Sequence, residues 1–378
     1  MTQRTTTDKA AEDTGAGAAG SSFGEDISAA GPNAGTGRVI DQFSWIRVIA
    51  CFAIILLHSL FAGSVYFEGS ITEGEILWSG IAENLLMWAV PCFLMVTGAL
   101  LLDPEKDLPV SRIYGKYLKR VVLALVVFTL IFQVIGYFME GEQTIIRDWL
   151  ADLFLGRSWA HMWYLYLMIG IYLMMPFYRM VVKAADPKML DLLIILIFVF
   201  TSVTSVFSAL GYVPAFYIPT TIVYPLYVFA GYRLYKRPVA VWPAVLAVLA
   251  STAAIILMTY LRYSSEVLID LAVSEEEAQL DYLFDYYSPL VALQSAGIFS
   301  LMCRIPAKAD AFLKSLDACT FGIYLIHMIG IHAIMKWAGF DPYSYGPFAF
   351  LLIALILFAA SFAVTWIIRK IISGRRAV

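Results

Sequence analysis

The sequence predicts an all-α protein, a polytopic membrane bundle of about ten transmembrane helices with both termini in the cytoplasm. Its 378 residues are 61% hydrophobic, whereas soluble domains average roughly 45–50%. Apolar stretches of about twenty residues, long enough for a helix to cross a bilayer, recur along the chain. Lysine and arginine are concentrated in alternate connecting segments. The formal net charge is only −3, so the composition does not indicate a nucleic-acid partner.

The predicted spans are long enough to cross as helices, and several end in the Trp and Tyr residues typical of a membrane interface. Such residues are Trp45, Trp78, Trp163, Tyr164 and Tyr287. In chain order, the predicted spans cover residues 44–66, 78–102, 118–138, 160–178, 189–209, 217–235, 240–261, 285–303, 317–337 and 347–369.

The distribution of Lys and Arg predicts which ends of these spans face the cytoplasm. If the N-terminus lies inside, the outside segments hold only four of the 26 Lys and Arg residues, namely Arg147, Arg157, Arg262 and Lys336. Cytoplasmic segments of membrane proteins carry an excess of Lys and Arg. The distribution therefore predicts that both termini are cytoplasmic.

The chain divides into a long membrane domain and two short tails. Residues 1–40 are rich in Ala, Gly, Thr and Ser and have few large apolar side chains, so we expect a disordered cytoplasmic tail. Residues 41–372 form the transmembrane domain, and residues 373–378 a short basic cytoplasmic tail. The cysteines show no Cys-x-x-Cys pair, so we expect apolar packing and neither disulfides nor a metal site. They are Cys51, Cys92, Cys303 and Cys319.

The first span carries two ionisable residues, Arg47 and His58. Eleven helical steps of about 100° end only about 20° past three full turns, so both side chains share one face, roughly 16 Å apart along the axis. Ionisable groups inside a membrane are usually functional. Alternatively, Arg47 is a snorkelling anchor near the inner interface and His58 makes a helix–helix hydrogen bond.

The other histidines also fall at mid-membrane or in the predicted outer half. His161 lies at the outer end of its span, where a site role and an interface role are equally compatible with the sequence. For His327 a hydrogen bond within the bundle is favoured, with Tyr324 as its polar neighbour on the same face. For His332 packing is favoured. Glu83, in the second span, is predicted either to orient a histidine or to pair with an outside arginine.

The second span contains a predicted kink and a small-residue surface. Pro91 removes a backbone hydrogen bond and should bend the helix. Thr97 and Gly98 would let another helix or a ligand chain approach closely. The basic stretch that follows is either ordinary inside charge or a phosphate-binding mouth. Its members are Arg112, Lys116, Lys119 and Arg120.

Several segments together resemble the integral-membrane acyltransferase-3 family, which includes bacterial O-acyltransferases of surface polysaccharides and glycolipids. The Arg47-x₁₀-His58 spacing matches the family's signature. Further similar segments, in the family's order, are VPCFLMVTG at 90–98, KRVV at 119–122, HMWYLYLMIGIYLMMP at 161–176, FAGYRL at 229–234 and FGIYLIH at 321–327. The family's usual Ser before Gly is Thr97 here, which keeps the hydroxyl, and Met87 and Trp88 stand where many relatives carry an arginine.

The resemblance implies a multi-pass acyltransferase of the bacterial plasma membrane that uses cytoplasmic acetyl-CoA. The acyl-CoA nucleotide would dock near Arg47 and the basic stretch 112–120, with Thr97 along the path of the acyl-bearing arm. A glycan or lipid-linked sugar within the membrane environment would be the acceptor.

His58 would act as general base on the acceptor hydroxyl or carry the acyl group transiently, with Glu83 and His161 as further catalytic candidates. Two alternatives use the same features. One is a transporter or flippase of a glycan or lipid-linked sugar, and the other is an acyltransferase that uses succinyl or longer acyl donors.

Overall fold

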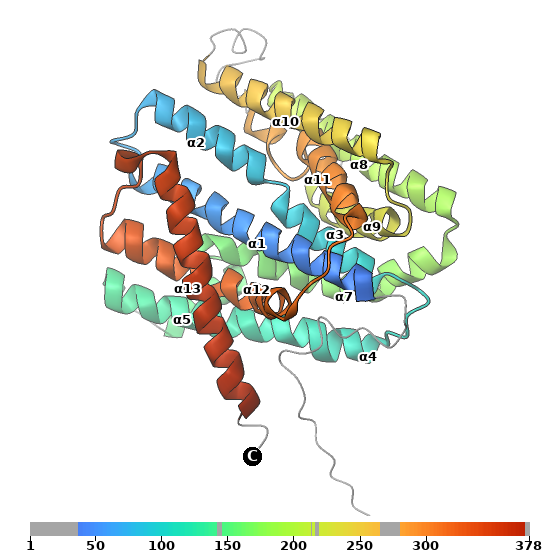
Figure 1. Ribbon diagram of the computed structural model, residues 1–378, viewed down its shortest axis with the longest axis horizontal. Coiled ribbons are helices and arrows are strands. Elements are labelled where there is room, and N and C mark those ends of the chain that lie inside the picture. Colours follow the sequence, from blue (N-terminus) through green and yellow to red (C-terminus); the bar gives the residue numbers. More distant parts are fainter. Residues whose placement is uncertain (1–36, 142–145, 213, 216–218, 265–279, 375–378) are drawn as a thin grey trace, which may run out of the picture.

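The computed structural model is a bundle of helices (Figure 1). It describes residues 37–141, 146–212, 214–215, 219–264 and 280–374, and these ranges contain no strand. The predicted all-α membrane fold is therefore confirmed. Most of the two predicted tails, 1–40 and 373–378, lies outside the described residues.

The helices follow the predicted order. They are α1 (Gly37–Tyr66), α2 (Glu73–Leu86), α3 (Ala89–Leu101), α4 (Val110–Arg112), α5 (Lys119–Glu140), α6 (Ile146–Leu155), α7 (Trp163–Ala184), α8 (Pro187–Ala209), α9 (Val223–Lys236), α10 (Val241–Ser264), α11 (Pro289–Arg304), α12 (Ala311–Ile331) and α13 (Pro347–Gly374). Two π-helices, η1 (Ile113–Leu118) and η5 (His332–Trp337), lie between α4 and α5 and directly after α12. The short 3₁₀ turns are η2 (Ala160–Met162), η3 (Thr220–Ile222), η4 (Leu280–Leu283) and η6 (Tyr343–Tyr345).

Eight helical segments of the described chain are long and apolar enough to cross a membrane. Two of the predicted spans, 217–235 and 285–303, correspond to α9 with 14 residues and α11 with 16 residues. Both are shorter than the roughly 20 residues that span a bilayer directly. The total of ten spans and the orientation of the termini stay predictions.

The outer surface of the bundle is apolar, as lipid contact requires. Large side chains are exposed on α10 and α13, including Trp242, Leu246 and Phe348. Helices α1 and α3 instead bury most of their side chains, such as Ile46 and Leu94. Helix α1 packs against α2, α3, α12 and α13, and it crosses the middle of the view in Figure 1. Its polar side chains therefore face protein and not lipid.

The second predicted span is broken where proline requires it. Helix α2 ends at Leu86, and α3 begins at Ala89. Pro91 has no N–H to donate to the carbonyl of Met87, four residues earlier. The ladder resumes when the N–H of Cys92 donates to the carbonyl of Trp88 at 3.1 Å. The predicted kink is confirmed.

Glycines bring α3 and α9 into backbone contact. A Cβ added to Gly98 would lie 1.8 Å from the carbonyl oxygen of Val228, and one added to Gly231 would lie 2.1 Å from that of Met95. The small-residue surface predicted around Gly98 is therefore filled by another helix. The two segments that meet, VPCFLMVTG and FAGYRL, are both segments that resemble the acyltransferase-3 family.

We expect the Gly98→Ala variant to be less stable than the wild type, by about 1–3 kcal/mol, because the new methyl group has no room beside the α9 backbone. The thermal midpoint of the purified protein in detergent measures the effect. The matched control is Gly170→Ala on α7, where no atom lies within 4 Å of the added Cβ. Alanine favours a helix over glycine, so the control should be neutral or more stable. Equal midpoints for Gly98→Ala and the wild type would contradict the close crossing.

Candidate functional site

Three histidines from different parts of the chain meet inside the bundle. They are His58 on α1, His161 on η2 and His327 on α12, and we call them the histidine cluster. His58 Nδ1 lies 2.8 Å from His327 Nε2. The centroid of the His161 ring lies 5.4 Å from that of His327 and 6.4 Å from that of His58. The structure thus joins two predicted candidates, His58 and His161, with His327, for which the sequence favoured a hydrogen bond within the bundle.

The cluster is closed from most sides. His327 and His161 are 0% and 2% exposed, while His58 is partly accessible. His327 Nδ1 lies 2.6 Å from the backbone carbonyl oxygen of Tyr324, and the Tyr324 hydroxyl donates to the backbone carbonyl of His161. Tyr324 is therefore a polar partner of His327, as predicted, but through its main chain.

Neither ring nitrogen of His161 makes a hydrogen bond of ordinary geometry within the described part of the chain, although the Leu325 backbone lies close to the ring. In the same ranges, no three His, Cys, Asp or Glu side chains are arranged to hold a metal ion. A buried imidazole with at least one nitrogen that makes no hydrogen bond is available to a bound group.

Aromatic side chains line the histidine cluster on the side of α5 and η5. The Trp159 ring lies between Phe132 and His332, with centroid distances of 4.3 Å and 4.1 Å and nearly parallel planes. The Tyr66 hydroxyl lies 3.1 Å from His332 Nε2. His332 begins the π-helix η5, a wide turn that often occurs beside functional sites. The packing role favoured for His332 agrees with these contacts.

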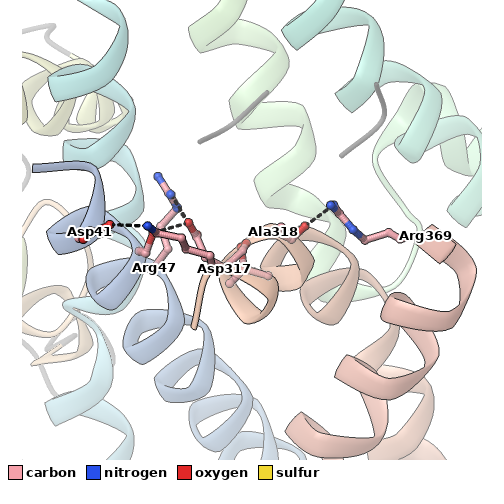
Figure 2. Close-up of polar contacts among 8 residues, drawn as sticks. Asp41, Arg47, Asp317, Ala318 and Arg369 are labelled. Carbon is pink, nitrogen blue, oxygen red and sulfur yellow. Dashed lines mark hydrogen bonds and ion pairs between the residues drawn. The ribbon is translucent and has the colours of Figure 1, made fainter. Parts of the chain in front are cut away.

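Arg47 forms a buried ion pair with Asp317, the seventh residue of α12 (Figure 2). The two residues are 6% and 5% exposed. Arg47 Nε donates to one carboxylate oxygen at 2.5 Å, and Nη2 and the Ser44 hydroxyl donate to the other. Arg47 Nη1 is buried without a hydrogen-bond partner among the described residues. The side chain therefore faces the protein interior and does not snorkel to an interface.

Sequence reasoning did not find Asp317. The available signal was its place at the start of the predicted span 317–337, in the stretch KSLDACTFGIYLIH. A carboxylate inside an apolar stretch is costly and needs a partner. Loss of one partner from a buried ion pair typically costs 3–5 kcal/mol, because the other charge stays unpaired. Arg47 is thus bound primarily to α12.

The residues of the basic stretch 112–120 have different environments. Arg112 and Lys119 are exposed, whereas Lys116 and Arg120 are partly buried. The Arg120 guanidinium lies 4.5 Å from the centroid of the Phe321 ring, one turn after Asp317 on α12. Its Nε is buried without a hydrogen-bond partner within the described ranges. The contact between Arg120 and Phe321 therefore connects this stretch to α12.

A further arginine that the sequence did not single out approaches the same part of α12. Arg369 on α13 donates through Nη1 to the carbonyl of Ala318 at 2.7 Å. Figure 2 shows Arg47 and Arg369 reaching α12 from different sides. Together with Arg120, they surround the first turns of α12 with positive charge.

Two predicted site residues lie elsewhere. The Thr97 hydroxyl donates to the carbonyl of Phe93 in its own helix at 2.9 Å. Glu83 is within electrostatic reach of Arg262 and of the Tyr343 hydroxyl, and its Oε1 is buried without a hydrogen-bond partner in the described structure. Of the two roles predicted for Glu83, its surroundings favour the one with an outside arginine.

A match to a protein family covers nearly the same residues as the predicted membrane domain, 41–372. A family model described as "Acyltransferase domain" matches residues 40–370. Searches of curated proteins and of solved structures returned no significant match. The matched range includes both the histidine cluster and the arginines around α12. The chain therefore belongs to the acyltransferase-3 family and is a multi-pass membrane acyltransferase.

Proposed function

We propose that the protein is an O-acetyltransferase of the bacterial inner membrane. It would move an acetyl group from cytoplasmic acetyl-CoA to a hydroxyl of a cell-envelope glycan or glycolipid on or near the outer face. The observation that supports this most is the histidine cluster, where the partly accessible His58 is hydrogen-bonded inside a membrane acyltransferase. The family resemblance and the distribution of charge support this choice of acyl donor, acceptor and membrane.

The proposed chemistry needs a base, because a neutral hydroxyl is a weak nucleophile. His58 takes the proton from the acceptor hydroxyl while the hydroxyl oxygen attacks the carbonyl carbon of the thioester. The new C–O bond forms and the C–S bond breaks. The leaving sulfur then takes the proton from the His58 imidazolium, which yields free CoA and restores the neutral base.

His161 is the second catalytic candidate in this proposal. Its buried ring lies beside His58 and His327, and at least one of its nitrogens makes no hydrogen bond among the described residues, so it can hydrogen-bond the acceptor or the leaving sulfur. Glu83 is next to Arg262 and has no described contact with the cluster. We therefore give Glu83 no part in proton transfer.

The donor end would lie around the first turns of α12. Phosphates bind where N–H donors and positive charge converge. Arg120 Nε is a buried hydrogen-bond donor without a partner among the described residues, and a phosphate of the acyl donor would satisfy it. The exposed Arg112 and Lys119 are suited to the outer parts of the nucleotide. Arg47 and His58 are separated by roughly 16 Å along α1, an interval that suits an extended acyl-bearing arm.

We expect purified His58→Ala to lose transfer by about 10²–10⁴-fold, the usual contribution of a positioned general base. Release of free CoA from acetyl-CoA in the presence of envelope glycolipid measures the rate, and parallel reactions with succinyl-CoA and longer acyl-CoA test the choice of donor. An unchanged thermal midpoint and elution volume would show that the variant is folded. Wild-type turnover by folded His58→Ala would overturn the role of His58.

We expect Arg120→Gln to weaken acetyl-CoA binding by roughly tenfold or more, because a charge-assisted hydrogen bond is worth about 1.5–3 kcal/mol. Direct binding to the purified protein, measured by calorimetry, checks this. Arg237→Gln is the matched control, since Arg237 is an exposed arginine on the same predicted side of the membrane. If both variants bind the donor equally well, the donor phosphates do not contact Arg120.

A further inference from the structure

We propose that His327 is a positioning residue that fixes the tautomer of His58, so that His58 Nε2 is the nitrogen that carries the reactive lone pair. The inference rests on the proposed function only in giving that lone pair a use. The tautomer itself follows from the hydrogen bonds, and it can be measured without any reaction.

The chain of hydrogen bonds starts at the main chain. A backbone carbonyl can only accept a hydrogen bond, so the 2.6 Å contact between His327 Nδ1 and the carbonyl of Tyr324 places a proton on Nδ1. In a neutral imidazole that carries its proton on Nδ1, the other nitrogen is an acceptor. His327 Nε2 is therefore an acceptor that points at His58.

A charged His327 would change this assignment, because both of its nitrogens would then donate. The neighbours of its ring argue against a charge. Among the described residues, the titratable groups that contact its ring are His58 on α1, His161 on η2 and Tyr324 on α12 itself. None of them is a carboxylate, and a fully buried charge without a counter-charge is costly. His327 is accordingly assigned as neutral.

The second link follows from the first. His58 Nδ1 lies 2.8 Å from His327 Nε2 and must donate to it. The two ring planes differ by only 10°, and the centroids are 5.1 Å apart. This arrangement fits two imidazole rings that lie side by side in a common plane and meet nitrogen to nitrogen. The lone pair of the accepting nitrogen lies in that plane. Neutral His58 therefore has its proton on Nδ1 and a bare Nε2.

A fixed tautomer matters because a base or nucleophile must offer its lone pair to the substrate at one defined place. In Ser-His-Asp enzymes a carboxylate holds the histidine in this way, and loss of the correct tautomer lowers the rate greatly. Here an imidazole anchored on the main chain takes the place of the carboxylate. The arrangement serves both general-base and acyl-carrying roles of His58, since both use Nε2.

The test uses ¹⁵N-histidine spectra of the full chain in lipid nanodiscs. The protein has only four histidines, so single substitutions assign every signal. We expect a protonated Nδ1 and a bare Nε2 for His58, and a protonated Nδ1 for His327. A bare Nδ1 on His58 in the assigned wild-type spectrum would overturn the proposal.

Two variants of His327 test the consequence. His327→Leu keeps an apolar side chain of similar bulk but offers no acceptor, so His58 should lose its single tautomer and kcat should fall at least about tenfold, with acetyl-CoA binding unchanged. His327→Gln can place its amide oxygen to accept from His58 Nδ1 and should recover most of the rate. A merely structural His327 would change the thermal midpoint but leave the His58 tautomer and kcat of the folded fraction as in wild type, and that result would overturn the proposal.

Failure of the proposed function of His58 can be distinguished from failure of the positioning role of His327. If His58→Ala keeps full activity while the wild-type spectrum shows the expected tautomers, the proposed function of His58 is wrong and the assignment by His327 stands. If His58→Ala is inactive but His327→Leu retains both kcat and the His58 tautomer, the positioning role is wrong and the proposed function stands.

Discussion

The buried ion pair between Arg47 and Asp317 is the interaction on which the arrangement of the site depends. It joins α1 to α12, and neither residue forms another ion pair among the described residues. The ion pair is one of several contacts that run in the same order along both helices. These contacts are Asp41–Lys314, Arg47–Asp317, Cys51 Sγ to the carbonyl of Thr320, and His58–His327. The two helices are therefore parallel and in fixed register.

That register links the two ends of the site. His58 follows Arg47 by eleven residues, and His327 follows Asp317 by ten, so both helices cover nearly the same length of about 15–16 Å. Once the ion pair is in place, the two imidazoles meet without further adjustment. The same first turns of α12 also receive Arg120 and Arg369. Helix α12 thereby carries the contacts to the arginines in its first turns and the contact to His58 three turns later.

Local sequence patterns predicted the parts of the site that lie within one helix. The shared face of Arg47 and His58, the break at Pro91 and the membrane class all follow from periodicity, proline chemistry and hydrophobicity. Partners distant in sequence could not be predicted in this way. Asp317 is 270 residues from Arg47, and the local sequence around neither residue indicates the other as its partner. The lengths of α9 and α11, which pack against α3 and α10, also could not be predicted from apolar composition.

The transfer rate of the double variant Arg47→Met/Asp317→Leu tests the central claim most directly. Either single substitution leaves one charge buried and unpaired, at a typical cost of 3–5 kcal/mol, whereas replacing both with apolar residues is often neutral. If Arg47 acts by holding α12 in register, the double variant should recover most of the kcat that Arg47→Met loses. A double variant as inactive as Arg47→Met, despite a restored thermal midpoint, would contradict the account and assign Arg47 directly to the donor.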